Sequence, residues 1–80
     1  MIKVRFFGLI RVYSGQRQIE VEAKTVRDAL KKATELGVDN TLLSSALIFV
    51  NNRQLTGTRR MSYKLSPGDE LSLLSPAGGG

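Results

Sequence analysis

The sequence predicts an α+β fold in which one helix packs across one face of a sheet of four to five strands. Three observations support this prediction. Apolar and polar residues alternate over residues 2–7 and 17–22, which is typical of strands with one buried face. Apolar residues recur at helical spacing over residues 25–36. Two more strand-like segments follow at residues 46–51 and 70–74, so a single helix is left to cover the sheet.

The first two strands are expected to pair as an antiparallel hairpin. They are separated by a connection at residues 8–15, for which we predict no regular structure. One face of each strand is apolar and is expected to face the core. The residues on these faces are Ile2, Val4, Phe6, Ile19 and Val21.

The main helix has sequence signals at both ends. The Thr25 hydroxyl can cap the first turn, and Asp28 stands three residues later, which is the capping-box spacing with Asp in place of Glu. Gly37 is placed to end the helix in a left-handed conformation. The apolar stripe expected to face the sheet comprises Val26, Ala29, Leu30, Ala33 and Leu36.

The second half of the chain is predicted to complete the sheet. Residues 38–45 are expected to form a connection, with a short turn at its two leucines. Residues 46–51 are nearly all apolar and suit a central strand that ends in an Asn-Asn turn. A short strand at residues 53–55 follows the turn. The Ser-Pro-Gly-Asp sequence at residues 66–69 predicts the turn before the last strand, residues 70–74.

The composition excludes many kinds of catalytic site. The 80 residues include no cysteine and no histidine, which rules out disulfides, zinc sites built on thiolate or imidazole, and Cys-His or Ser-His catalysis. We therefore expect a single domain that is not an enzyme and binds no metal or cofactor itself. No apolar run approaches the roughly 18 residues of a membrane span. We expect a cytoplasmic protein that does not contact a membrane.

The chain is basic, with 12 Lys and Arg against 7 Asp and Glu, a net charge of +5 and a pI of about 10.1. Such a balance is compatible with an acidic partner or with nucleic acid. The cationic residues are scattered. The two adjacent pairs, Lys31-Lys32 and Arg59-Arg60, are expected to be solvated, with a role as docking charges as the alternative. A basic β-rich module that binds nucleic acid is one alternative function, but it leaves the C-terminal sequence unexplained.

The chain ends in Ser-Pro-Ala-Gly-Gly-Gly, which offers no side chain to a core. Because ordering three glycines costs conformational entropy without burying surface, we expect a domain of residues 1–75 and a flexible tail of residues 76–80. Such a tail also suits a frayed end or an engineered remnant. Its functional interpretation is that glycines, which lack a Cβ, can thread a narrow channel and present the terminal carboxylate to another protein's active site.

Several segments in this order resemble the MoaD/ThiS family of small sulfur carriers, which includes the small subunit of molybdopterin synthase. The segments are the first strand with its glycine at residues 1–8, the helix start at 25–30, Val50-Asn51, Gly68-Asp69-Glu70-Leu71, Pro76 and Gly79-Gly80. The resemblance covers the whole chain. It implies a ubiquitin-like β-grasp fold, with a mixed sheet in which the last strand runs parallel to the first.

The resemblance also implies a function for the tail. A ubiquitin-activating-like enzyme, using ATP and magnesium, would adenylate Gly80, and a sulfur donor would convert it to a thiocarboxylate, with Gly79 as the preceding residue of the motif. The sulfur would then enter molybdopterin, with the synthase large subunit as a further partner. Sulfur transfer to the thiazole of thiamin, and attachment of Gly80 to target proteins as a modifier, remain alternatives. The sequence departs from the family in its basic charge, because such carriers are often acidic.

Two apolar residues stand on the otherwise polar faces of the first and last strands. Phe7 shares a face with charged residues, and Leu74 shares one with a serine. In residues 46–51, either Leu47 and Phe49 or the alternate pair would join them, and Leu55 is a further candidate for the patch. Such a patch is typical of a partner surface. The alternatives are scattered surface residues and packing under the loop at residues 56–64.

The resemblance assigns partner contacts to particular positions. Those matching Phe7, Leu55 and Leu74 lie at the interfaces with the activating enzyme and the synthase. Pro76 and Gly78 are expected to contact the partner as part of the tail, although family members often carry a larger residue in place of Gly78.

Overall fold

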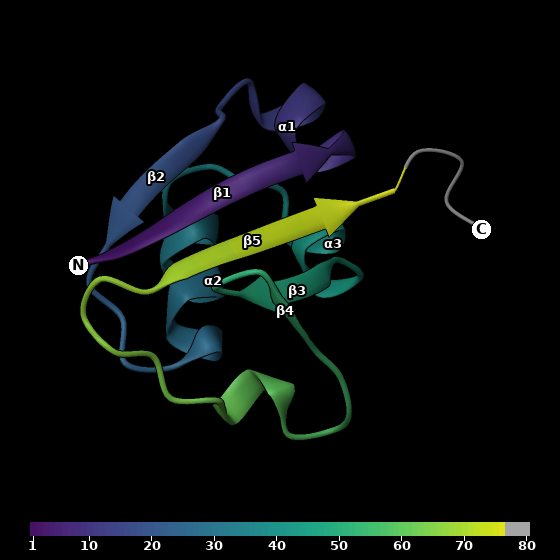
Figure 1. Ribbon diagram of the computed structural model, residues 1–80. Coiled ribbons are helices and arrows are strands. Elements are labelled where there is room, and N and C mark those ends of the chain that lie inside the picture. The colour runs from purple at the N-terminus through teal and green to yellow at the C-terminus, as the bar shows by residue number, and fades with distance from the viewer. Residues whose placement is uncertain (77–80) are drawn as a thin grey trace.

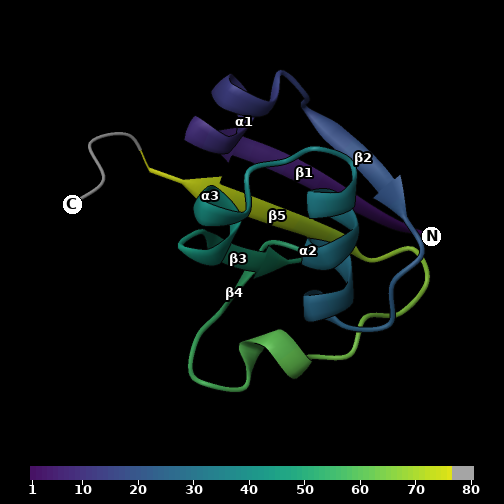
Figure 2. The ribbon, with the colours of Figure 1, turned by 180° about the vertical axis from the view of Figure 1, so that it is seen from behind.

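The computed structural model of the chain describes residues 1–76 and confirms the predicted α+β fold. A five-stranded mixed sheet has the order β2-β1-β5-β3-β4, and the helices cover one face of it (Figures 1 and 2). The elements in chain order are β1 (Ile2–Gly8), α1 (Leu9–Ser14), β2 (Gln18–Val21), α2 (Val26–Glu35), α3 (Asn40–Ser44), β3 (Leu47–Val50), β4 (Arg53–Leu55), the 3-10 helix η1 (Arg60–Ser62) and β5 (Glu70–Ser75).

The last strand in the sequence, β5, lies at the centre of the sheet. It runs parallel to β1 on one side and antiparallel to β3 on the other. The N-terminal hairpin of β1 and β2 is antiparallel, as predicted. The middle strand therefore ends at the same end of the sheet as β1 (Figure 1).

The core lies between the sheet and α2, and it contains most of the residues that the alternation predicts. Ile2, Val4 and Phe6 are almost fully buried, as are Leu71 and Leu73 of the central strand. Burying a side chain of this size contributes about 1.5–3 kcal/mol relative to leaving it exposed. The buried side chains on the inner faces of β1 and β5 thus hold these two strands in a fixed register.

Helix α2 begins as its sequence predicts. The Thr25 hydroxyl accepts a hydrogen bond from the N–H of Asp28, with an N···O distance of 3.2 Å. The Asp28 carboxylate accepts one from the N–H of Lys24 at 3.4 Å, one residue before the cap. The reciprocal bond of a capping box is therefore displaced by one residue, from the cap itself to the residue before it.

The end of α2 corrects one predicted core residue. Gly37 adopts a left-handed conformation, with φ of +98°, as expected. The N–H of Gly37 donates to the carbonyl of Thr34 and that of Val38 to Ala33, which is a Schellman motif. This turn places Val38 in the core and leaves Leu36 exposed, so the prediction that Leu36 faces the sheet was wrong.

Two short helices occupy segments for which we predicted connections. Helix α1 fills most of residues 8–15 and buries Ile10. Helix α3 fills most of residues 38–45, begins at an Asp39 cap and buries Leu43. Each has at most six residues, which is too short for a helical apolar pattern to repeat.

The C-terminal strand is one residue longer than predicted, because Ser75 pairs with Gly8 and is buried. Pro76 is exposed. The expected tail residues Gly78, Gly79 and Gly80 lie outside the described residues, so the flexible tail stays a prediction. Within residues 1–76, no helix has both the length and the apolar character to cross a membrane.

Candidate partner-binding site

Three apolar residues form a row across the face of the sheet that the helices leave uncovered. In the pairing of the strands, Phe7 of β1 lies opposite Leu74 of β5, and Leu74 lies opposite Leu47 of β3. Opposite residues of neighbouring strands point to the same face of a sheet. Phe7 and Leu74 are half-buried and Leu47 is exposed. We call Phe7, Leu74 and Leu47 the apolar row.

A shallow hollow adjoins the apolar row. Phe49 lies two residues along β3 from Leu47, and it pairs with Ser72 of β5. The small Ser72 side chain lies between Phe49 and Arg5, its partners on the two neighbouring strands. Because larger side chains surround this serine, they line a hollow of 270 Å³, which also includes Phe7 and Leu74. The face is therefore apolar and concave, as protein-binding surfaces often are.

Arg5 fixes the polar border of this hollow. Its guanidinium lies 3.2 Å from a carboxylate oxygen of Glu70 and 5.3 Å from the centroid of the Phe7 ring. The ion pair is partly exposed and therefore contributes little to stability. Its effect is to hold a cation beside the ring, where its charge is available to a partner.

A second group of arginines lies beside the face, toward α1. Arg5, Arg11 and Arg17 line a hollow of 220 Å³ together with neutral residues only. The border of the apolar row nearest α1 is therefore cationic.

Strand β5 ends next to the apolar row. Ser75 pairs with Gly8, one residue beyond the pairing of Leu74 with Phe7. Gly8 has φ of +68°, and a Cβ there would overlap the carbonyl of Ser75. Only glycine allows the backbones of β1 and β5 to approach this closely in this conformation. A protein bound to the apolar row thus lies beside Ser75 and Pro76, the last residues that the structure describes.

Leu55 does not lie on this face, and our expectation that it shares the patch was wrong. It pairs with Ile48, which is buried in the core, and its side chain packs against the core on the helix side. Asn51 and Asn52 have φ of 50° and 70°, which is a two-residue hairpin turn of the I′ type. This turn places Gln54 opposite Phe49 and so directs Leu55 to the other face.

The structure also decides which residues of β3 lie on the outer face. The structure selects Leu47 and Phe49 for the outer face, because Ile48 and Val50 are buried. Pro76 is exposed directly after β5, and its contact with a partner stays a prediction. Sequence reasoning did not identify the hollow at Ser72, since its formation depends on which three strands are neighbours.

The turn before β5 is held by Asp69. Its carboxylate accepts hydrogen bonds from the N–H of Ser66 at 2.8 Å and from the Asn51 side chain at 3.1 Å. These two bonds, the first being the stronger influence, hold the pKa of Asp69 below its ordinary value of 3.8. Asn51 also accepts from the N–H of Glu70, so the network fixes the start of the strand that leads to the C-terminus. It is a structural site. Within the described part of the chain, no cluster of three or more potential metal ligands occurs.

Solved structures of other proteins share this architecture. The subunit 1 and 2 complex of molybdopterin-converting factor from Helicobacter pylori 26695 contains a chain that is 25% identical, with a TM-score of 0.72 and coverage of 99% of this chain and 97% of that one. The Amycolatopsis orientalis BexX/CysO complex gives a TM-score of 0.79 at 18% identity over 100% of both chains. Small archaeal modifier protein 1 from Methanosarcina acetivorans gives 0.78 at 22% identity over 99% and 95%. The fold is that of the ubiquitin-like β-grasp carriers and modifiers.

The family follows from the sequence itself. The model of the ThiS family matches residues 4–80, and the chain belongs to this family. The resemblance to MoaD/ThiS sulfur carriers is therefore confirmed. A search of the curated proteins finds none that matches the chain.

Proposed function

We propose that the protein is a sulfur carrier whose C-terminal Gly80 is activated by a partner enzyme and converted to a thiocarboxylate. The observation that carries this proposal is the position of the apolar row one residue from the point where β5 ends. A partner that covers Phe7, Leu74 and Leu47 gains hydrophobic stabilisation of about 25 cal/mol per Å² buried. It also holds the start of the tail in a fixed position.

The reaction needs little from the carrier itself. The Gly80 carboxylate attacks the α-phosphorus of ATP, which forms an acyl adenylate and releases pyrophosphate. Hydrosulfide delivered by the sulfur donor then attacks the acyl carbon and displaces AMP, leaving the thiocarboxylate and a proton. The partner supplies ATP, magnesium and the catalytic groups, so the chain is a substrate and not an enzyme. Pro76, Gly78 and Gly79 are proposed to lie inside the partner's channel and to contact its walls.

We assign the sulfur to molybdopterin synthesis. The assignment is supported by the similar chain in the complex of subunits 1 and 2 of molybdopterin-converting factor, at 25% identity. The large subunit of molybdopterin synthase is then a second partner for the same face. Because adenylation consumes ATP, we place the protein in the cytoplasm.

Two alternatives have support from particular similarities. Transfer to the thiazole of thiamin is favoured by the name of the matching family, ThiS. Use as a protein modifier is favoured by the similarity to small archaeal modifier protein 1. Both use the same activated glycine, and they differ in whether sulfide or a lysine amine attacks it. Binding of nucleic acid is a weaker alternative, because it gives the apolar row no role.

The experiment that tests the proposal is an activation assay. The full chain is incubated with ATP, magnesium, a sulfide source and the adenylating enzyme from the same organism, and its intact mass is measured. We expect the mass change of one oxygen replaced by sulfur, and we expect none in a variant lacking Gly79 and Gly80. Adducts with other proteins in place of the thiocarboxylate would favour the modifier. An unchanged mass with an enzyme that activates other carriers would contradict the proposal.

A further inference from the structure

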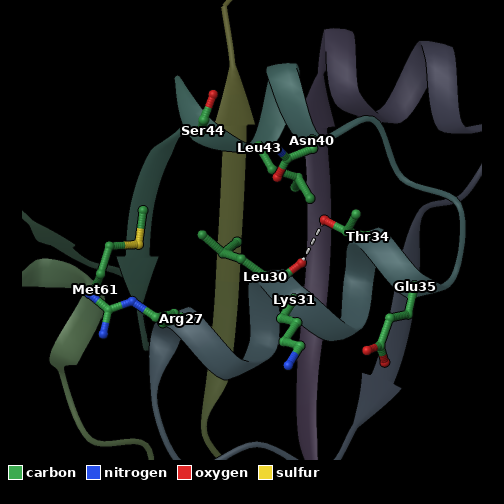
Figure 3. Close-up of a pocket in the computed structure, with 9 residues that line it drawn as sticks. All are labelled: Arg27, Leu30, Lys31, Thr34, Glu35, Asn40, Leu43, Ser44 and Met61. Carbon is green, nitrogen blue, oxygen red and sulfur yellow. Dashed lines mark hydrogen bonds between the residues drawn. The ribbon is translucent and has the colours of Figure 1, made fainter.

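A groove lies on the helix side of the molecule, on the opposite side of the sheet from the apolar row. It has a volume of 580 Å³ and lies between α2, α3 and η1 (Figure 3). Helix η1 is distant in the sequence from α2 and α3, so neither the helix pattern nor the strand pattern predicted the groove. The proposed sulfur-carrier function does not use this groove.

The groove has an aliphatic floor. Leu30 of α2 and Leu43 of α3 lie at its centre, and Met61 of η1 lies at one side (Figure 3). Leu30 and Leu43 are largely buried and Met61 is partly buried, so the floor is a continuation of the core that reaches the surface. An apolar side chain placed here would bury further surface at about 25 cal/mol per Å².

Two cations without carboxylate partners border this floor. Arg27 and Lys31 are one helical turn apart on α2, and both line the groove. In the part of the chain that the structure describes, the one side-chain ion pair joins Arg5 to Glu70, far from here in the fold. Like charges at this spacing disfavour the isolated helix slightly, so the pair does not serve helix stability. Glu35, one turn further along, is the single acidic residue among those lining the groove.

The surroundings carry charges of both signs. Arg60 begins the 3-10 helix that carries Met61, and Arg59 precedes it. Two nearby carboxylates are already engaged with the backbone: Asp28 accepts from the N–H of Lys24, and Asp39 accepts from that of Thr41 at 2.7 Å. Both carboxylates keep their negative charge, so the positive excess is small and comes from the lining itself, where Arg27 and Lys31 stand against Glu35.

We propose that this groove binds an acidic amphipathic segment of a partner protein. The apolar side chains of the segment contact Leu30, Leu43 and Met61, and its carboxylates face Arg27 and Lys31. An aliphatic floor bordered by cations is complementary to such a segment in both apolar surface and charge. Nucleic acid fits less well, since bases stack on aromatic side chains and none lines the groove.

The location of the groove adds a consequence for function. Because the groove and the apolar row are on opposite sides of the sheet, one protein can hold the groove while another occupies the row and the tail. The protein at the groove would then keep the carrier bound while different proteins occupy the apolar row in turn. This proposal does not depend on which acceptor receives the sulfur, or on whether sulfur is transferred at all.

The test uses a defined probe and the full chain. The probe is an acetylated, amidated peptide of about 12 residues, the length of three helical turns, with leucines at helical spacing between glutamates. Its counterpart carries lysine in place of glutamate. Binding is followed by the amide NMR shifts of the isotope-labelled protein. We expect the acidic peptide to shift residues of α2, α3 and η1, and to leave Phe7 and Leu74 unchanged.

Two charge reversals of equal size provide a matched comparison. Arg27→Glu removes a cation from the groove, whereas Lys32→Glu makes a similar change on an exposed residue of the same helix that does not line it. We expect Arg27→Glu to weaken binding of the acidic peptide about fivefold, the upper end for an exposed pair, and Lys32→Glu to change it less than about twofold.

Three results would overturn the proposal. One is equal weakening by the two variants, which would indicate a diffuse charge effect. Another is a shift pattern centred on the apolar row. The third is tighter binding of a single-stranded oligonucleotide than of the peptide at the same groove, which would make nucleic acid the ligand.

Discussion

Phe7 and Leu74 are direct neighbours in the parallel pairing of β1 and β5, one residue before Gly8 and Ser75 close the pairing. Their inward neighbours, Phe6 and Leu73, are buried in the core. The register of the two strands is therefore fixed from the inside while the outer pair remains available to a partner. This relationship joins a binding surface to the start of the C-terminal sequence.

Leu74→Ala is expected to separate partner binding from stability. Leu74 is half-buried, so its loss should lower the free energy of unfolding by less than the 2–5 kcal/mol typical of a fully buried leucine. Affinity for the activating enzyme should fall at least about fivefold, because central apolar contacts dominate interfaces. Calorimetric titration measures the affinity. Leu36→Ala is the control, since Leu36 is an exposed leucine on the helix side. Equal affinities of Leu74→Ala and Leu36→Ala for the enzyme would show that the apolar row is not part of the interface.

Gly8→Ala is expected to be strongly destabilising. A Cβ at Gly8 would overlap the Ser75 carbonyl, and φ of +68° disfavours any other residue. Conformational strain and the collision together should cost about 3 kcal/mol, measured by urea unfolding.

Gly15→Ala is its matched control. Gly15 has φ of +70°, but nothing lies within 4 Å of a Cβ built there. It should cost about 1 kcal/mol, from conformational strain alone. If the two variants were equally stable, close approach of β1 and β5 at Gly8 would not be the reason for a glycine.

Acid is expected to weaken the turn before β5 through Asp69. A carboxyl whose pKa is lowered on folding gives stability that is fully present above its ordinary value of 3.8 and is lost as the pH falls through the folded pKa. Protonation weakens the bonds from Ser66 and Asn51. Unfolding free energies measured from neutral pH down to about pH 2 should therefore decline more steeply for the wild type than for Asp69→Asn. If the unfolding free energies of the wild type and the variant fell equally with pH, Asp69 would not be the source of the acid sensitivity.

Thr25→Ala is expected to lower the free energy of unfolding by about 1 kcal/mol, because it removes the hydroxyl that caps α2. Chemical unfolding measures the change. Thr58→Ala, at an exposed loop residue, should have no measurable effect. A smaller loss for Thr25 than for Thr58 would contradict the assigned cap.

The sequence predicted those parts of the fold that depend on local pattern. Alternation in β1 identified its buried residues, and the signals at Thr25 and Gly37 gave the bounds of α2 within one residue. The parallel pairing of β1 with β5 came from the family resemblance, because alternation within a strand carries no information about its neighbour or direction.

The wrong predictions concern residues whose burial depends on how separate segments of the chain pack together. Leu36 continues the helical spacing, yet the Schellman turn replaces it in the core with Val38. The face of Leu55 depends on whether the Asn51-Asn52 turn has two residues, which residue types alone did not establish. The same limit applies to the site: Phe7 and Leu74 could be selected by their positions within strands, but the hollow at Ser72 and the groove at Met61 required the assembled fold.

The most direct test of the central claim is fragment-ion mass spectrometry of the C-terminal tryptic peptide after ATP-dependent activation. Cleavage after Lys64 gives residues 65–80, a peptide that contains neither cysteine nor methionine and hence no sulfur of its own. The account predicts that sulfur appears in this peptide and that the fragment ions place it on Gly80. Sulfur found only in the methionine-containing remainder of the chain, or a C-terminal peptide unchanged by a competent enzyme, would contradict it.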